Sequence, residues 1–192
     1  MGGMHNPHSR EKLIEAIIYF ARNAKNLGKT KLLKLLYFLD FIHFRQTGKS
    51  VTGLDYYAWD MGPVPSDLWY ELAEETLPPD LAQAISIQPV PLSSSGEMHT
   101  VKARRKFNPV HFTPRERRIM EQLADVFRDA TAKEMVEVSH LRNQPWDRTI
   151  REKGDRRKID YLLAVDSSPD ALPLDIIEER LADIEEMEQL FG

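Results

Sequence analysis

Residues 30–47 constrain the fold more than any other part of the sequence. They read TKLLKLLYFLDFIHFRQT and are followed by Gly48, a residue type that often ends helices. At about 100° per residue, the apolar side chains cover almost every side of a helix. A surface helix shows only one apolar stripe, so this segment is predicted to be a helix in the middle of a domain. Lys31, Lys34 and Arg45 fall near one stripe, and we expect that narrow edge to contact water.

Patterns along the rest of the chain predict an α+β fold, in which a single, mainly helical domain carries a small antiparallel β-sheet. Apolar periodicity and capping residues predict one helix that begins near Ser9 and others over about 66–76, 114–129, 131–141 and 174–191. β-branched and aromatic residues predict extended structure over 51–59, 85–92 and 100–107. The last two segments are expected to form a hairpin with a long, flexible loop, and all three to contribute to the sheet.

The length of 192 residues suffices for one domain with its own core. We divide the chain into a flexible N-terminal tail (1–10), the domain (11–166), and a linker with an acidic amphipathic C-terminal helix (167–192). The sequence has no cysteine, which excludes disulfides and thiolate metal sites and fits a reducing compartment. The N-terminus lacks the apolar run of a signal peptide, and the longest apolar stretch is too short to span a bilayer. We therefore expect a cytoplasmic protein with no membrane partner.

Three patterns that sometimes carry chemistry do not form a recognisable motif here. The sequence GKT at 28–30 lacks the earlier glycine and the preceding strand of a phosphate-binding loop, because Asn23 stands at the glycine position. The six histidines show no credible metal-ligand spacing. His140 and Asp147 have the chemistry of a base and its orienting carboxylate, but no nucleophile accompanies them in a recognisable turn. We expect no catalytic, cofactor-binding or metal-binding residue, and a protein that is not an enzyme.

Charge is segregated in the C-terminal half of the chain. Seven lysines and arginines lie between Lys102 and Arg118 against Glu116 alone, whereas 174–192 holds seven acidic residues against Arg180 alone. The basic segment has the charge to contact nucleic acid, and the acidic helix the charge to bind a basic protein. The alternatives are that each is a solvated face or that the two attract each other. No base-reading recognition helix is evident, so DNA binding is the less favoured interpretation.

The final helix has a narrow apolar seam beneath its acidic face. Its apolar residues recur at three- and four-residue steps: Leu174, Ile177, Leu181, Ile184, Met187 and Phe191. Such a seam packs either on its own domain or on a partner, and the pattern is compatible with both.

The stretch YAWDMGPVPSDLWYEL places two tryptophans, a glycine and two prolines just before a helix. Pro63 and Pro65 cannot lie inside a helix, because proline lacks a backbone N–H and pushes the preceding residue towards extended geometry. Gly62 permits close approach of another group or unusual dihedral angles. We interpret the stretch as a rigid corner, with Trp59 in the core and Trp69 either in the core or against a partner.

Three motifs occur in a characteristic order. The first is a Lys-Leu-x-Lys-Leu-Leu-Tyr helix, here Lys31, Leu32, Lys34, Leu35, Leu36 and Tyr37, with Asp40 after it. The second is an Ala-Trp-x-x-Gly-Pro-Val segment, here Ala58, Trp59, Gly62, Pro63 and Val64. The third is a Ser-His followed by a Pro-Trp, here Ser139, His140, Pro145 and Trp146, then Gly154 and Ile159. From about Leu13 to Val165 the chain thus resembles the Panacea domain of the SocA-like antitoxin and phage-associated protein family.

The resemblance implies a binding module: an antitoxin of a bacterial or phage toxin–antitoxin system that neutralises a cognate toxin by direct contact. The SocA-like branch implies an alternative, a proteolytic adaptor that delivers a toxin to a bacterial protease. A DNA-binding regulator that uses the basic 102–118 segment is a further alternative. The candidates for partner binding are Lys31, Lys34, Tyr37, Asp40, Trp59, Gly62, Pro63, Val64, Trp69, His140 and Trp146.

Overall fold

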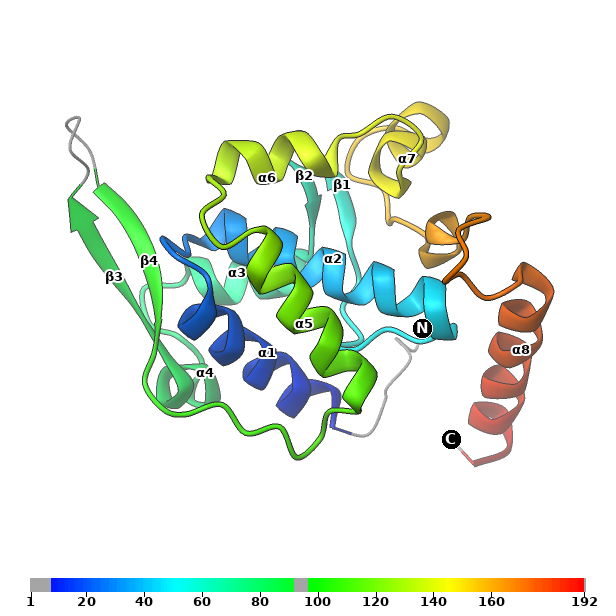
Figure 1. Cartoon of the computed structure of the whole chain (residues 1–192), viewed down its shortest axis with the longest axis horizontal. Helices are drawn as coiled ribbons and strands as arrows, with labels where there is room; N and C mark the ends of the chain where they lie inside the picture. Colours follow the sequence, from blue (N-terminus) through cyan, green and yellow to red (C-terminus); the bar gives the residue numbers. More distant parts are fainter. Residues whose placement is uncertain (1–7, 92–96, 192) are drawn as a thin grey trace.

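Helix α2 (Lys29–Thr47) runs through the middle of the protein, and most other elements pack around it (Figure 1). The computed structural model describes residues 8–91 and 97–191. Within these residues the chain forms eight α-helices, one short 3-10 helix and two antiparallel two-stranded sheets. The predicted α+β class with a single, mainly helical domain is therefore confirmed.

The central position of α2 agrees with its sequence, since leucines on all sides of the helix are buried. Gly48 ends the helix in the left-handed conformation, with φ of +73°. The expectation of a wet edge is wrong for two of its three residues, because Lys31 and Lys34 are each only 1% exposed. Their ammonium groups contact backbone carbonyl oxygens of neighbouring segments instead of water. Arg45, near the end of α2, is partly exposed.

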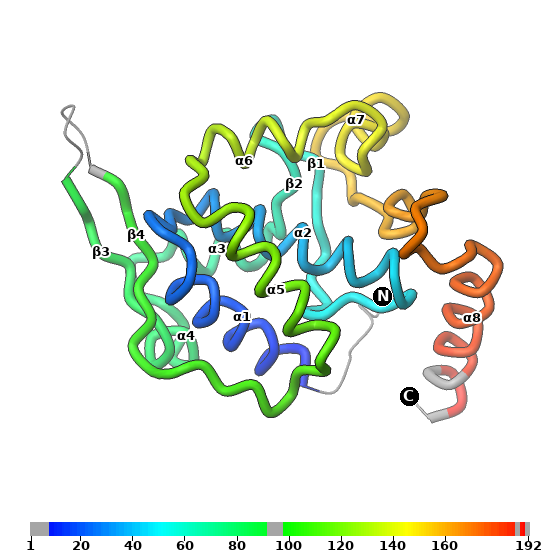
Figure 2. Tube along the Cα trace, viewed as in Figure 1, coloured from blue at the N-terminus to red at the C-terminus, as the bar shows by residue number. Residues whose placement is uncertain are grey.

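Two longer helices, α1 (Ser9–Asn23) and α5 (Pro114–Val126), pack on α2 and on each other (Figure 2). A buried ion pair joins them, with 2.7 Å between Lys12 Nζ and Glu116 Oε1. Five shorter elements complete the domain: α3 (Ser66–Ala73), α4 (Pro79–Ala84), α6 (Ala132–Ser139), α7 (Pro145–Lys153) and the 3-10 helix η1 (Tyr161–Ala164).

Helices α4 and α7 were missed by the sequence patterns, and α3 and α5 end about three residues earlier than predicted. The reason is length. Helices of six and nine residues are too short to show a clear 3.6-residue period. Proline occupies the first turn of both, which is favourable at a helix start but reads as a breaker in the sequence. Helix α6, by contrast, begins next to the predicted residue 131, where Thr131 and Glu134 form a capping box.

The two sheets are separate hairpins, so the prediction of one sheet built from 51–59 and 85–107 is wrong. Strand β1 (Tyr57–Trp59) pairs with β2 (Gly62–Val64), and β3 (Ile85–Pro91) pairs with β4 (Glu97–Ala103). The β3–β4 hairpin was predicted, although its loop at 92–96 lies outside the described residues. The partner of β1 was missed because a Gly-Pro-Val segment reads as a turn. Proline is tolerated there because a two-stranded sheet has only edge strands.

Helix α8 (Leu174–Phe191) forms where the sequence predicts it and lies at the opposite end of the protein from the β3–β4 hairpin (Figure 1). Its first half packs on the domain. Ile177 is fully buried against Gly48, and Arg180 donates a 2.7 Å hydrogen bond to the Thr47 carbonyl oxygen. The side chains at 187 and 191 lie outside the described part, as does most of the predicted tail (1–7). Ser9 and Arg10 at the end of that tail already belong to α1.

Candidate partner-binding site

Lys34 lies directly beneath the β1–β2 hairpin. Its ammonium nitrogen donates a 2.8 Å hydrogen bond to the Pro63 carbonyl oxygen. Gly62, one residue earlier, has φ of +95°, a conformation that residues with a side chain rarely adopt. A Cβ atom built on Gly62 would lie 2.6 Å from Ser139 Oγ and 2.9 Å from Lys34 Nζ. Glycine is therefore required both by the backbone conformation and by the close approach of two other elements.

The charge of Lys34 is poorly compensated. Burial lowers the pKa of its ammonium group to about 7, and none of the ion pairs among the described residues includes it. His140 lies close enough to be affected: burial and then the charge of Lys34 lower the pKa of its imidazole. Near neutral pH the ring is thus held in its neutral form, which suits a packing role better than a salt bridge.

Trp146 connects the third motif to the second. Its indole Nε1 donates a 2.9 Å hydrogen bond to the Trp59 carbonyl oxygen, and its ring stacks on His140 with centroids 3.8 Å apart and planes within 8°. Trp146 is the second residue of α7, so this contact also fixes the start of that helix against β1. The hairpin is held from two sides, by Lys34 beneath β2 and by Trp146 at the end of β1.

Asp40 organises the segment that leads into β1. One carboxylate oxygen accepts hydrogen bonds from the backbone N–H groups of Val51 and Thr52, each at 2.8 Å. The other accepts from the Thr52 hydroxyl at 2.5 Å and from the Tyr56 hydroxyl at 2.7 Å. Complete burial raises the pKa of the Asp40 carboxyl, and these four hydrogen bonds oppose the shift. The carboxylate thus fixes the path of 51–56, which the sequence patterns described as a strand.

Lys31 and Tyr37 also face inwards. Lys31 Nζ donates to the carbonyl oxygens of Lys25 and Arg128, at 2.9 and 3.0 Å, and so ties the loop after α1 to the loop after α5. Tyr37 packs against Phe41 and Tyr56. Burial raises the pKa of its phenol, and a hydrogen bond with the Trp146 backbone opposes this.

Trp59 and Trp69, unlike the buried residues described above, are partly exposed at the surface. Trp59 is half-buried, and its ring lies edge-on to that of Trp69 at 5.4 Å. Tyr70 extends the cluster, with its ring 5.1 Å from that of Trp69. The exposed fractions are 37% for Trp69, 55% for Tyr70 and 62% for Met61, which lies in the hairpin turn. We call Trp59, Met61, Trp69 and Tyr70 the aromatic platform.

Sequence reasoning missed Tyr70 and Met61, although a signal for Tyr70 was present. Leu68 and Leu72 are four residues apart on α3 and both 1% exposed, so they define its buried side. At about 100° per residue, Tyr70 must then face outwards, whereas Trp69 lies at the edge of the buried side. The expectation that Trp59 lies in the core is only half met, because its ring packs on the core and is also partly exposed.

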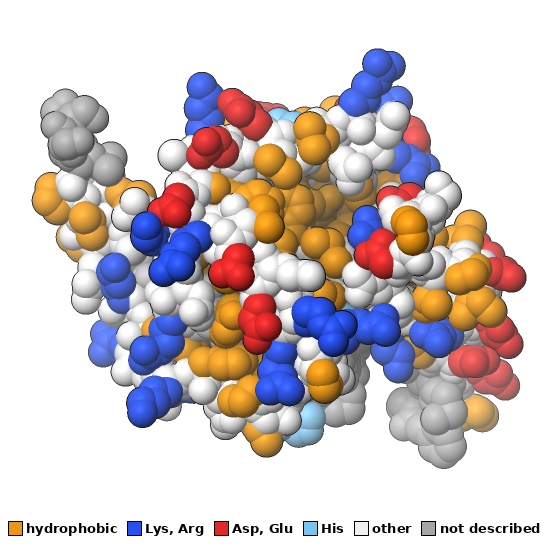
Figure 3. Space-filling view, viewed as in Figure 1, with side chains coloured by type: hydrophobic (Ala, Val, Ile, Leu, Met, Phe, Trp, Pro, Cys, Tyr) orange, Lys and Arg blue, Asp and Glu red, His pale blue; other side chains and the backbone are white. Residues whose placement is uncertain are grey.

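An apolar groove lies on another face, between α2, α6 and α7, and is visible as the hollow in Figure 3. Its volume is about 220 Å³. Phe38, Phe41 and Ile42 of α2 line it, and Leu141, which is 55% exposed, lies at its edge. The groove shares Tyr37 and Ser139 with the motifs described above.

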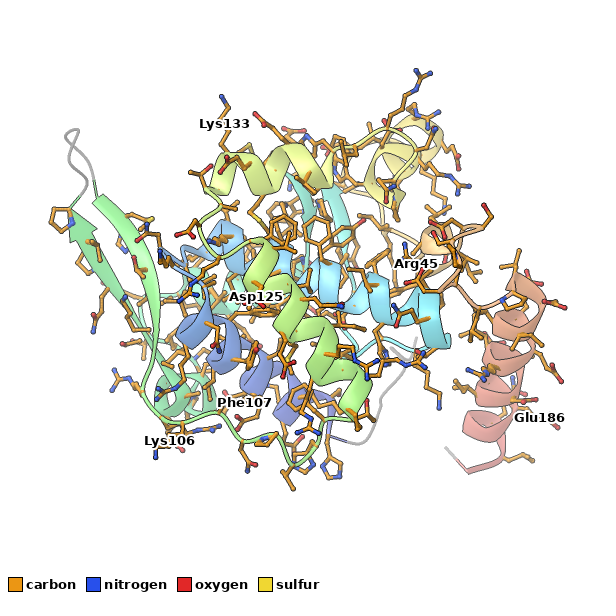
Figure 4. The ribbon with its side chains drawn as sticks, viewed as in Figure 1. Arg45, Lys106, Phe107, Asp125, Lys133 and Glu186 are labelled. Atoms are coloured by element: carbon orange, nitrogen blue, oxygen red, sulfur yellow. The ribbon has the colours of Figure 1, made fainter. Side chains whose placement is uncertain are left out.

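The basic 102–118 segment is partly engaged within the chain. Arg104 donates to the Ile85 carbonyl oxygen, Arg105 lies 2.6 Å from Glu15, and Arg115 donates to the Gln46 carbonyl oxygen. Figure 4 places Lys106 and Glu186 of α8 on opposite sides of the protein, and none of the ion pairs between described residues joins the basic segment to α8. The described residues contain no group of three His, Asp or Glu side chains that could hold a metal.

The candidate residues thus fall into two groups that contact each other. Most are buried and hold the β1–β2 hairpin and its neighbours in place, whereas Trp59 and Trp69 belong to the aromatic platform. A family model described as "Antitoxin SocA-like, Panacea domain" matches residues 32–147, which is more than half of the chain. The chain belongs to the SocA-like antitoxin family. Its Panacea domain includes most of α2, both strands of the β1–β2 hairpin, α3, α6 and the start of α7. No curated protein and no solved structure matches the chain. None of the described helices is long and apolar enough to cross a membrane.

Proposed function

We propose that this protein is the antitoxin of a bacterial or phage toxin–antitoxin system and neutralises a cognate protein toxin by binding it directly. The observation that carries the proposal is the match of the Panacea domain over residues 32–147. That match covers the elements that hold and present the aromatic platform.

The physical arrangement supports a binding function. Neutralisation by contact is favoured by a surface that is rigid before the partner arrives, because ordering loops and side chains on binding costs free energy. Here Lys34, Trp146 and Gly62 fix the β1–β2 hairpin, and Met61 in its turn and Trp69 and Tyr70 on α3 are exposed. Tryptophan and tyrosine are the residue types most often found to dominate binding energy at interfaces.

The experiment is growth of cells that express the adjacent open reading frame, with and without this protein. We expect growth arrest by the neighbour alone, rescue when the pair is expressed, and co-purification of the two proteins. A toxic neighbour that this protein neither rescues nor binds would contradict the proposal.

The same cells separate neutralisation from proteolytic delivery. If the antitoxin acts by binding, the amount of toxin stays constant or rises on rescue, with or without the bacterial protease. Rescue that requires the protease and is accompanied by loss of the toxin would instead support the adaptor alternative.

A further inference from the structure

The aromatic platform contains three aromatic rings that lie next to one another. The Trp59 ring lies edge-on to the rings of Trp69 and Tyr70, with centroids 5.4 and 6.4 Å away. Met61, in the turn that follows Trp59, adds a flexible apolar side chain that is 62% exposed. The three rings contact one another, so they present one continuous surface with both apolar faces and polar edges.

The platform is rigid because each of its parts is anchored from below. The Trp59 backbone is fixed by the indole of Trp146 at 2.9 Å and by pairing with Gly62 across the hairpin. Helix α3 is fixed through Leu68 and Leu72, which are each 1% exposed. A partner that docks here therefore finds the rings already in place, and the entropy cost of binding is reduced.

Three carboxylates lie near the platform residues in the sequence. Asp60 lies in the hairpin turn next to Trp59, Asp67 precedes Tyr70 by three residues on α3, and Glu74 follows Tyr70 by four. All three carboxylates are on exposed residues and take part in none of the ion pairs between described residues. The neighbouring Glu71 is different, because it binds Arg10 at 2.9 Å.

The chain itself shows which chemistry this surface accepts. The guanidinium group of Arg156 lies 5.0 Å from the centre of the Trp59 ring, a cation–π distance. Trp69 and Tyr70 offer further ring surface of the same kind, and the carboxylates nearby add attraction for positive charge. Phosphate groups of nucleic acid or of an anionic membrane would be repelled by the same carboxylates.

We propose that the aromatic platform is a docking surface for an arginine- or lysine-bearing segment of a partner protein, whose cationic side chain stacks on Trp69 and Tyr70 between Asp67 and Glu74. The partner is the cognate toxin, so this part of the inference rests on the proposed function. The occupant is assigned by charge complementarity together with the Arg156 contact, both of which favour a cation over an apolar side chain alone.

The first test does not depend on a toxin. The full-length protein is titrated with an arginine-rich and a glutamate-rich peptide of equal length, and binding is followed by isothermal titration calorimetry, a readout that does not depend on Trp69. We expect a saturable response with the arginine-rich peptide, and at least fivefold weaker binding in the double variant Trp69→Ala/Tyr70→Ala. Equal responses to both peptides, or an unchanged response in the double variant, would overturn the docking surface.

The second test uses the purified product of the adjacent open reading frame and measures its affinity. The double variant and the charge-reversed variant Asp67→Lys/Glu74→Lys are expected to bind at least tenfold more weakly than the wild type. The matched control is Val126→Ser, which changes an apolar residue on α5 that is 73% exposed, and it is expected to bind within twofold. Circular dichroism and the melting temperature establish that each variant is folded.

The outcomes separate the two proposals. If the wild type does not bind the neighbour's product while the peptide result holds, the docking surface stands and the proposed function fails. If the wild type binds the product and the double variant binds it equally well, the function stands and the docking surface is wrong. A second copy of this chain is another occupant to test, by sedimentation of the protein alone. If the wild type is a dimer and the double variant is a monomer, the platform is a self-association surface and the proposal is overturned.

Discussion

The ammonium nitrogen of Lys34 lies 2.8 Å from the carbonyl oxygen of Pro63, and this hydrogen bond joins the central helix to the hairpin that bears Trp59 and Met61 of the aromatic platform. Both residues are buried. Most of the motif residues that suggest partner binding from sequence are likewise buried and hold the proposed binding surface in place. The direct role of the candidates in binding stays a prediction, and Trp69 is the clearest exposed member.

Gly62→Ala is expected to destabilise the protein strongly. Alanine would be strained at φ of +95°, and its Cβ would lie 2.6 Å from Ser139 Oγ. Strain of this kind costs about 1–3 kcal/mol and overpacking a similar amount again. Gly154→Ala is the matched control, since Gly154 has φ of +92° but nothing within 4 Å of the added Cβ. Urea unfolding of both variants separates the clash from the backbone strain. Equal losses would show that the close approach is unimportant.

The contribution of Lys34 to stability is expected to depend on pH. Burial lowers its pKa to about 7 in the folded state, from 10.5 for an ordinary lysine. Between these values the unfolded state binds more protons, so the free energy of unfolding rises with pH, by up to about 1.4 kcal/mol per pH unit. We expect the wild type to gain stability relative to Lys34→Met from pH 7 to pH 10. Chemical denaturation at several pH values measures this, and a constant difference would show that the ammonium group is not desolvated.

Asp40→Ala and Asp40→Asn are expected to differ. Alanine leaves two backbone N–H groups and two hydroxyl groups without their buried acceptor, a loss of at least about 3 kcal/mol. Asparagine keeps one acceptor oxygen for the N–H groups of Val51 and Thr52, and the hydroxyls of Thr52 and Tyr56 can accept from its amide. It also removes the buried charge. The free energies of unfolding should place Asp40→Asn clearly nearer the wild type, and the reverse order would show that these hydrogen bonds do not stabilise the 51–56 segment.

Trp146→Phe is expected to lower the melting temperature, because the hydrogen bond from the indole to the Trp59 carbonyl oxygen is lost while the ring that stacks on His140 remains. A buried hydrogen bond contributes about 0.5–1.5 kcal/mol, and an unsatisfied carbonyl adds to the loss. Trp69→Phe is the control, because its ring is 37% exposed and should be replaceable with little effect on stability. If both variants have the same melting temperature as the wild type, the indole of Trp146 does not hold the hairpin.

The sequence allowed the main helices and the class of fold to be predicted because their signals are local. The apolar pattern of α2, the capping box of α6 and the amphipathic pattern of α8 each depend on residues within one element. The burial of Lys31 and Lys34 was not predictable in this way. The hydrogen-bond partners of the two lysines are backbone carbonyl oxygens, which every residue carries. No pattern of side chains in the sequence therefore predicts these contacts.

The platform was predictable only in part, for a similar reason. Trp69 is a candidate for partner binding from sequence because tryptophan is rare and large. The outward direction of Tyr70 follows from the helical positions of the buried residues Leu68 and Leu72. The contact of Arg156 with Trp59 joins residues 97 positions apart, and it becomes visible only once the loop after α7 is placed beside β1.

Neutralisation by direct contact is tested by measuring the binding of the purified protein to the purified product of the adjacent open reading frame, by isothermal titration calorimetry. We expect a saturable complex with a Kd below about 1 μM, formed without a protease or any other protein, and loss of toxin activity in that complex. Rescue of growth in cells without any complex between the two purified proteins would contradict it.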